Sequence, residues 1–174
     1  MEEQEKITVG QVSIKWGLIL AISLIVLSLV IQLSGLMGNQ AVSLINYLLI
    51  IIMVYLAQSS FKKEGDSYMS YGQGLGIGTL SIAIGTTVSS IFMYVYMKFI
   101  DETMLEKIKD LQYDKMIEQG MSEDQIDQAM EMSAAFMTPE IITIMAILVT
   151  MFIGFILTLI ITAITKNTNP AESV

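Results

Sequence analysis

Charged residues are absent from three long stretches of the sequence, which cover residues 16–61, 67–97 and 141–165. An α-helix needs about 20 consecutive, mainly apolar residues to cross the hydrocarbon core of a bilayer. The first stretch is long enough for two such helices joined by a tight turn, and each of the others is long enough for one. The pattern therefore predicts four transmembrane helices, over residues 16–36, 41–60, 72–97 and 139–165.

Short signals in the sequence separate these predicted spans. The sequence GLMGNQ, residues 35–40, supplies glycine and asparagine for a tight turn between the first two spans. The charged sequence KKEGD, residues 62–66, is expected to form a loop before the third span. At the start of the fourth span, Thr138 is suited to cap the helix, Pro139 to occupy its first position and Glu140 to complement its positive end.

The polar segment of residues 98–139 carries two stripes of residues at helical spacing, one on each side of Gly120. Gly120 is suited to end one helix, and Ser122 with Gln125 forms a capping-box signal for the next. We therefore expect two amphipathic helices outside the membrane, in a position that allows them to extend the third and fourth spans. The stripes are Met104, Ile108 and Leu111 before the glycine, and Ile126, Met130, Ser133 and Met137 after it.

The expected fold is all-α. It is one integral membrane domain over residues 1–174, with four transmembrane helices and an extramembrane acidic helical insertion, the amphipathic hairpin of residues 98–139. The composition agrees, since 53% of the residues are apolar and the mean hydropathy is +0.64. A soluble helical bundle is the alternative, but soluble helices carry a charged face and the charge-free stretches have none.

The sequence has no cysteine and no histidine. It therefore lacks disulfides, thiolate ligands, the usual general base and the commonest ligand of transition metals. No Asp, Glu, Lys or Arg lies in the three charge-free stretches, whereas proton-coupled pumps, voltage sensors and intramembrane acid–base enzymes usually carry such a residue. We therefore expect that the protein is not an enzyme and that it binds no cofactor, metal or nucleic acid.

Five glycines occur in YGQGLGIGTLSIAIG, residues 71–85. Their spacing does not match a dinucleotide-binding loop, a P-loop lysine is missing, and the potassium-filter sequence is absent. On a helix, Gly74, Gly78, Ser81 and Gly85 instead share one face, where small side chains let membrane helices approach closely. We interpret this stripe as a packing face whose partner is another span or a second copy; a hinge or a backbone-lined path is the alternative.

Residues 98–140 contain eleven carboxylates and four lysines. Six of the carboxylates form two rows at intervals of four residues, so each row follows one face of a helix. The rows are candidates for a surface that attracts a basic partner or hard cations, and the alternative is a solvated face without a partner. The first row is Asp110, Asp114 and Glu118, and the second is Glu123, Asp127 and Glu131.

Polar residues within the predicted spans include Gln32, Asn46 and Gln58. We expect them to form hydrogen bonds between helices, which is the usual role of such side chains in a membrane. A small polar cavity around Gln32 and Asn46 is the alternative.

The acidic sequence MEEQEK and the absence of a small-x-small cleavage site after the first span indicate an uncleaved signal-anchor. Orientation in a membrane follows the positive charges rather than the carboxylates. Five lysines lie on the side of both termini and four on the side of the insertion, so we expect both termini in the cytoplasm. The first group is Lys6, Lys15, Lys62, Lys63 and Lys166, and the second is Lys98, Lys107, Lys109 and Lys115.

Four blocks of the sequence carry a resemblance to a known family: YGQGLGIG at residues 71–78, YVYMKFID at 94–101, GMSEDQIDQAMEM at 120–132 and FMTPE at 136–140. They are similar to the four-span bacterial membrane proteins classed as domain of unknown function 4199, which are typical of Bacteroidota. The resemblance covers nearly the whole chain. It implies a multi-pass protein of the bacterial inner (cytoplasmic) membrane with a helical insertion before the last span, and it implies no activity.

These observations favour a small integral membrane protein that acts as a scaffold, an accessory subunit or a self-associating helical bundle. Its expected partners are the lipid bilayer and either a second copy or another membrane protein, with the acidic insertion as the contact surface. The alternative is an oligomeric transporter or channel component for a small solute. Its path would be lined by glycine, serine and threonine together with Gln32 and Asn46.

Overall fold

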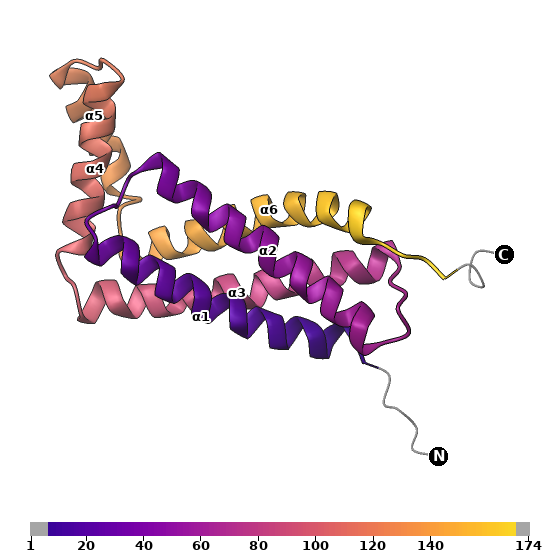
Figure 1. The fold of residues 1–174 in the computed structure, drawn as a ribbon. Helices are drawn as coiled ribbons and strands as arrows, with labels where there is room; N and C mark the ends of the chain where they lie inside the picture. Colours follow the sequence, from indigo (N-terminus) through magenta and orange to yellow (C-terminus); the bar gives the residue numbers. More distant parts are fainter. Residues whose placement is uncertain (1–6, 170–174) are drawn as a thin grey trace.

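The computed structural model describes residues 7–169, and this part of the chain forms six α-helices (Figure 1). Four of these helices, α1, α2, α3 and α6, are long and apolar enough to cross a membrane. The predicted all-α fold with four spans is therefore confirmed. The helices are α1 Val9–Leu33, α2 Gln40–Glu64, α3 Tyr71–Phe99, α4 Met104–Glu118, α5 Glu123–Ala134 and α6 Pro139–Thr165.

The first two spans are longer than the charge pattern predicted. Helix α1 begins at Val9 rather than at residue 16, because Thr8 and Gln11 form a capping box that starts the helix early. Helix α2 continues to Glu64, so most of KKEGD is the end of a helix rather than a loop. Long lysine side chains near the end of a span keep their charge in water. A charged residue therefore does not mark where such a helix stops. The acidic lead MEEQEK lies outside the described residues.

Three predicted helix signals are confirmed. The Thr138 hydroxyl accepts a hydrogen bond from a backbone N–H in the first turn of α6, where Pro139 also lies. The Gln125 side chain accepts a hydrogen bond of 3.0 Å from the backbone N–H of Ser122, as in a capping box. Gly120 follows the end of α4 with a φ of +78°, a conformation that costs glycine little.

Helix α3 contacts each of the other three spans. It packs extensively against both α1 and α6, and α2 contacts all three of these helices. Because the number of spans is even, α1 begins and α6 ends at the same end of the bundle, opposite α4 and α5. We call these two ends the terminal end and the hairpin end.

The hairpin of α4 and α5 stands at a steep angle to the spans and does not extend α3 or α6 (Figure 1). The expectation that it would continue these helices is therefore wrong. Helix α3 ends at Phe99, and the Asp101 carboxylate then accepts a hydrogen bond from the backbone N–H of Thr103. Such an Asx-type turn competes with helix continuation and redirects the chain. Residues 135–138 separate α5 from α6.

The buried core lies between α3 and its neighbours, and large apolar side chains elsewhere on the spans are exposed. Examples of exposed side chains are Leu48 of α2 and Leu148 and Phe152 of α6, as expected for surfaces that face lipid. The core has two clusters. One contains Val12, Ala57, Phe61, Met69 and Ile77, and the other contains Leu20, Leu24, Ile50, Val54, Ile82 and Ile161.

Candidate functional site

The stripe of small residues on α3 faces other spans of the same chain. Gly74, Gly78, Ser81 and Gly85 are all buried. At each of the three glycines, an added Cβ atom would lie closer than 3.0 Å to a side chain of another span. These side chains are Thr162 for Gly74, Thr158 for Gly78 and Leu20 for Gly85. The stripe is therefore occupied by contacts within the chain, and its residues are not exposed to a second copy.

Gln58 of α2 joins three spans near the terminal end. Its side chain is fully buried. Its Nε2 donates to the carbonyl of Gly74 at 3.0 Å and to the hydroxyl of Thr162 at 2.8 Å. Its Oε1 accepts a hydrogen bond of 2.5 Å from the hydroxyl of Thr165. Both ends of the amide are thus satisfied between helices, and the predicted interhelical hydrogen bond of Gln58 is confirmed.

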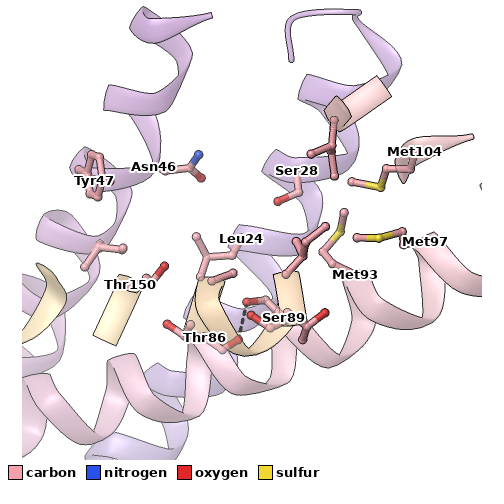
Figure 2. A pocket seen from close by; sticks show the side chains of 16 residues that line it. Leu24, Ser28, Asn46, Tyr47, Thr86, Ser89, Met93, Met97, Met104 and Thr150 are labelled. Atoms are coloured by element: carbon pink, nitrogen blue, oxygen red, sulfur yellow. Dashed lines mark hydrogen bonds between the residues drawn. The ribbon is translucent and has the colours of Figure 1, made fainter. Parts of the chain in front are cut away.

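At the hairpin end, the helices form a cavity of about 380 Å³ (Figure 2). Side chains from all four spans and from α4 line it, and none of the lining side chains is charged. Its volume lies in the lower part of the range of about 300–1,000 Å³ that is usual for small-molecule sites. The apolar part of the wall includes Met93, Met97 and Met104, and the polar part includes Asn46, Thr86 and Ser89.

One buried polar atom in this wall has no hydrogen-bond partner among the described residues. Thr86 is only 3% exposed, and its hydroxyl oxygen forms no hydrogen bond with any described residue. The neighbouring Ser89 hydroxyl donates to the backbone carbonyl of Thr86, at 3.1 Å, and not to its hydroxyl (Figure 2). Since buried polar groups are nearly always hydrogen-bonded, this hydroxyl, on a residue that lines the cavity, is an exception.

The amides that the sequence suggested for a polar cavity separate in the structure. Asn46 lines the cavity (Figure 2). Gln32 instead donates a hydrogen bond of 2.8 Å to the carboxylate of Asp101, between α3 and α4. The alternative of one cavity around both residues is therefore wrong for Gln32, and the expected hydrogen bond between helices is not found for Asn46 among the described residues. Gln32 lies near the end of α1, where its side chain reaches the turn after α3.

Asp101 connects the end of α1 with the start of α4. One of its carboxylate oxygens accepts the Gln32 hydrogen bond and forms an ion pair of 3.0 Å with Lys107. The other accepts hydrogen bonds from the backbone N–H and the hydroxyl of Thr103. The hydrogen bonds from Thr103 and Lys107, with a smaller contribution from Gln32, lower the pKa of Asp101 to about 2. The carboxylate is therefore held in its charged form at the base of the hairpin.

A second polar cluster joins the end of α3 to the start of α6. Lys98 forms an ion pair of 2.9 Å with Glu140, and the hydroxyl of Tyr94 donates to the same carboxylate oxygen at 3.0 Å. Glu140 thus has a partner on α3 in addition to its place at the positive end of α6. Together with the Asp101 cluster, this contact fixes the two chain segments that lead into and out of the hairpin.

All six carboxylates of the two acidic rows, on α4 and α5, are exposed. The ion pairs of the described residues involve none of the six. Within the same part of the chain, no group of three or more His, Cys, Asp or Glu residues could hold a metal ion. The role of the rows as a contact surface stays a prediction.

Sequence reasoning missed the cavity wall on α3. The signal was present, because the small-residue face of this helix continues beyond Gly85 through Thr86, Ser89, Met93 and Met97 at helical spacing. Along this face, glycine gives way to hydroxyl residues and then to methionine. Such a change indicates where close backbone contact ends and a gap between helices begins.

The fold defines a class of protein: a four-span α-helical membrane protein with a helical hairpin before its last span. The model of a family described as "Protein of unknown function (DUF4199)" matches residues 15–167. The chain therefore belongs to this family, as the resemblance in the sequence predicted. Comparison with curated proteins and with solved structures finds no match.

Proposed function

We propose that this protein acts by interaction in the bacterial cytoplasmic membrane, as a scaffold or accessory subunit and not as an enzyme. Its α4–α5 hairpin binds a basic surface of a second membrane protein. The observation that carries this proposal is the exposure of both acidic rows, whose six carboxylates are absent from the ion pairs of the described residues. A field of unpaired carboxylates attracts a positively charged surface and favours its association.

Exposed apolar side chains on and beside the hairpin support the same role. Ile117, Met132 and Phe136 are 52%, 79% and 67% exposed. Aromatic residues and methionine are enriched in protein interfaces. A basic partner with an apolar centre would therefore match both features of this surface.

A second copy is a less suitable partner than a different protein. The glycine stripe is buried inside the chain, so self-association would use the lipid-facing surfaces or the hairpin. Two hairpins of this composition carry like charges and repel each other. A self-associating bundle would thus depend on contacts between lipid-facing side chains alone.

The proposed orientation places both termini in the cytoplasm and the hairpin on the opposite side. Lys15, Lys62, Lys63 and Lys166 lie at or near the ends of spans at the terminal end. Lysines close to the ends of spans favour the cytoplasmic side. Ion pairs do not distinguish the two ends, because Lys15 at the terminal end is paired with Glu64 just as Lys98 and Lys107 at the hairpin end are paired with carboxylates.

The test compares the native protein with a variant in which all six carboxylates of the rows are replaced, Asp by Asn and Glu by Gln. In-cell crosslinking, purification in a mild detergent and mass measurement report what is captured. We expect the variant to lose about tenfold in captured partner, and capture by the native protein to weaken as salt rises.

The matched control replaces three other exposed carboxylates of the hairpin segment, Glu102, Glu106 and Asp124, and should retain the partner. Equal capture by all three proteins would contradict the proposal. So would recovery of the native protein as a lone monomer.

A transporter or channel component for a small solute is the second candidate, because the cavity offers a place for a solute between the four spans. The sequence suggested a solute path lined in part by Gln32, Asn46 and glycines. Asn46 lines this cavity, whereas Gln32 and the glycine stripe do not. Vesicles that contain the protein should then leak or accumulate a solute that empty vesicles do not. Identical behaviour of the two kinds of vesicle across ions and small metabolites would contradict this candidate.

A further inference from the structure

The cavity at the hairpin end combines two kinds of wall (Figure 2). Met93 and Met97 of α3 and Met104 of α4 supply flexible apolar side chains, which adapt their shape to a ligand. Asn46 and Thr86 supply an amide and a hydroxyl in the same space. This combination suits a molecule with an apolar body and one polar group.

The charge of such a molecule follows from the lining. None of the side chains around the cavity is charged. The cavity is only half enclosed, but its lining offers an ion no counter-charge to offset the hydration that the ion would lose there. The lining therefore favours a neutral ligand.

The position of its polar group follows from Thr86. The hydroxyl of Thr86 is buried and has no hydrogen-bond partner among the described residues, whereas the nearby Ser89 hydroxyl is already engaged. A hydroxyl can donate or accept a hydrogen bond. The hydroxyl oxygen itself is buried, so a carbonyl or hydroxyl group of the ligand would satisfy it once the Thr86 side chain rotates towards the cavity.

We propose that this cavity binds one uncharged, membrane-soluble amphiphile. The apolar chain of the ligand lies against the three methionines, and its hydroxyl or carbonyl group forms a hydrogen bond with Thr86. The inference depends on the cavity alone and requires neither transport nor a hairpin partner.

The test uses a 12-carbon alcohol with a photoreactive diazirine in its chain, added at low mole fraction to vesicles that contain the full-length protein. Mass mapping of the adducts should place them on Met93, Met97, Met104 and their neighbours. Unlabelled dodecanol should reduce labelling about tenfold. Dodecyl sulfate and dodecyltrimethylammonium have the same 12-carbon chain but carry a charge, so they should not reduce labelling. Equal competition by all three compounds, or labelling spread over the lipid-facing surfaces, would overturn the proposal.

Thr86→Val separates ligand binding from folding. The substitution removes a hydroxyl that has no partner, so the melting temperature without ligand should stay the same or rise. Labelling in the cavity of Thr86→Val should fall about fivefold to tenfold. Thr86→Ser keeps a hydroxyl, so its labelling should equal that of the native protein. If Thr86→Val leaves labelling unchanged, or if only water occupies the cavity and no labelling occurs in it, the proposal fails.

Ala146→Phe on α6 offers an independent variant, because Ala146 is an exposed residue that borders the cavity, where a phenyl ring would obstruct the entry of a ligand. Labelling in the cavity should fall about tenfold. The matched control is Leu148→Phe on the same helix, at a position that is 57% exposed and absent from the cavity wall, and it should have no effect. Equal labelling of these two variants would contradict the proposal. Because these assays measure binding of a small molecule, their failure would leave the capture experiment on the hairpin unaffected.

Discussion

Single side chains decide how closely the four spans approach one another. At Gly78, the absence of a Cβ atom lets Thr158 of α6 and Val54 of α2 lie against the backbone of α3. Further along the same helix, Thr86 and Met93 face a cavity instead. Contact is therefore tight along the glycine stripe, and a gap opens further along α3, beside Thr86 and the methionines.

Gly78→Ala should destabilise the protein. The new methyl group would overlap the Thr158 side chain, and overpacking of this kind costs about 1–3 kcal/mol. Gly72→Ala is the matched control on the same helix, because nothing lies within 4 Å of the Cβ that it would add. Thermal unfolding in detergent should show a lower melting temperature for the first variant only. Equal melting temperatures would mean that α3 does not pack as described.

Gln58→Leu should also lower stability, by about 1–2 kcal/mol, because interhelical hydrogen bonds in membranes contribute about 0.6 kcal/mol on average and up to about 1.7. The Gln58 side chain forms three interhelical hydrogen bonds. Asn46→Leu is the comparison, because the Asn46 side chain forms no hydrogen bond among the described residues. The measurement is the free energy of unfolding in the same detergent. A larger loss for Asn46→Leu than for Gln58→Leu would contradict this assignment.

At the scale of the element, the hairpin of α4 and α5 is attached by polar contacts rather than by a continuous helix. Asp101 brings together Gln32 of α1, Thr103 and Lys107. Since these contacts lower the pKa of Asp101 to about 2, the attachment depends on a charged carboxylate. The orientation of the hairpin should therefore respond to acid.

The sign of this pH dependence follows from the lowered pKa. An unfolded aspartate takes up a proton near pH 4, whereas folded Asp101 stays ionised to about pH 2. Its contribution is therefore complete above about pH 4 and is lost as the pH falls from about 4 to 2. Hydrogen exchange of the α4 amides should be faster in Asp101→Asn than in the native protein at pH 6, and the difference should disappear towards pH 2. A difference that stays constant over this range would refute the role of the charge.

Asp110→Asn is the control for the acid response. Its carboxylate is exposed and forms none of the ion pairs of the described residues. Exchange in α4 of this variant should follow the native protein at every pH. A change equal to that of Asp101→Asn would indicate a general effect of net charge instead of a local attachment.

At the scale of the whole molecule, an even number of spans places the start of α1 and the end of α6 at one end and the hairpin at the other (Figure 1). The terminal end is held by the Gln58 hydrogen bonds, and the hairpin end contains the cavity. A second pocket, of about 370 Å³, lies at the terminal end between α1 and α2, and Lys15 and Glu64 in its lining are charged. The uncharged lining of the cavity at the hairpin end, and not a difference in volume, therefore locates ligand binding there in our proposal.

The proposed topology can be tested with single cysteines, since the native sequence contains none. Lys63→Cys lies at the terminal end and Asp127→Cys lies on the hairpin. In intact cells, a membrane-impermeant maleimide should label the second variant and should label the first only after the membrane is opened. Labelling of both from the same side would contradict four spans, and the reverse pattern would overturn the proposed orientation.

The sequence by itself determined the four spans, the two amphipathic helices and several helix starts. These features depend on signals that are local in the chain: charge-free runs, residues at helical spacing, and caps such as Thr138 and Ser122. The transfer of apolar residues into lipid and the capping of a helix end need no knowledge of distant residues. The charge-free run alone predicted that the first helix begins at residue 16, whereas α1 begins at Val9. The prediction was wrong because a lysine can lie within a helix close to the end of a span.

Only the tertiary structure decided which surfaces meet. It placed the glycine stripe against α6 and α1 within the chain, paired Gln32 with Asp101, and set the hairpin at a steep angle to the spans. It also brought side chains from five helices around one cavity and left the Thr86 hydroxyl without a hydrogen-bond partner among the described residues. Each of these outcomes depends on contacts between residues far apart in the sequence. Several arrangements of four apolar helices satisfy the same hydrophobic pattern, and only the fit of side chains between helices selects one of them.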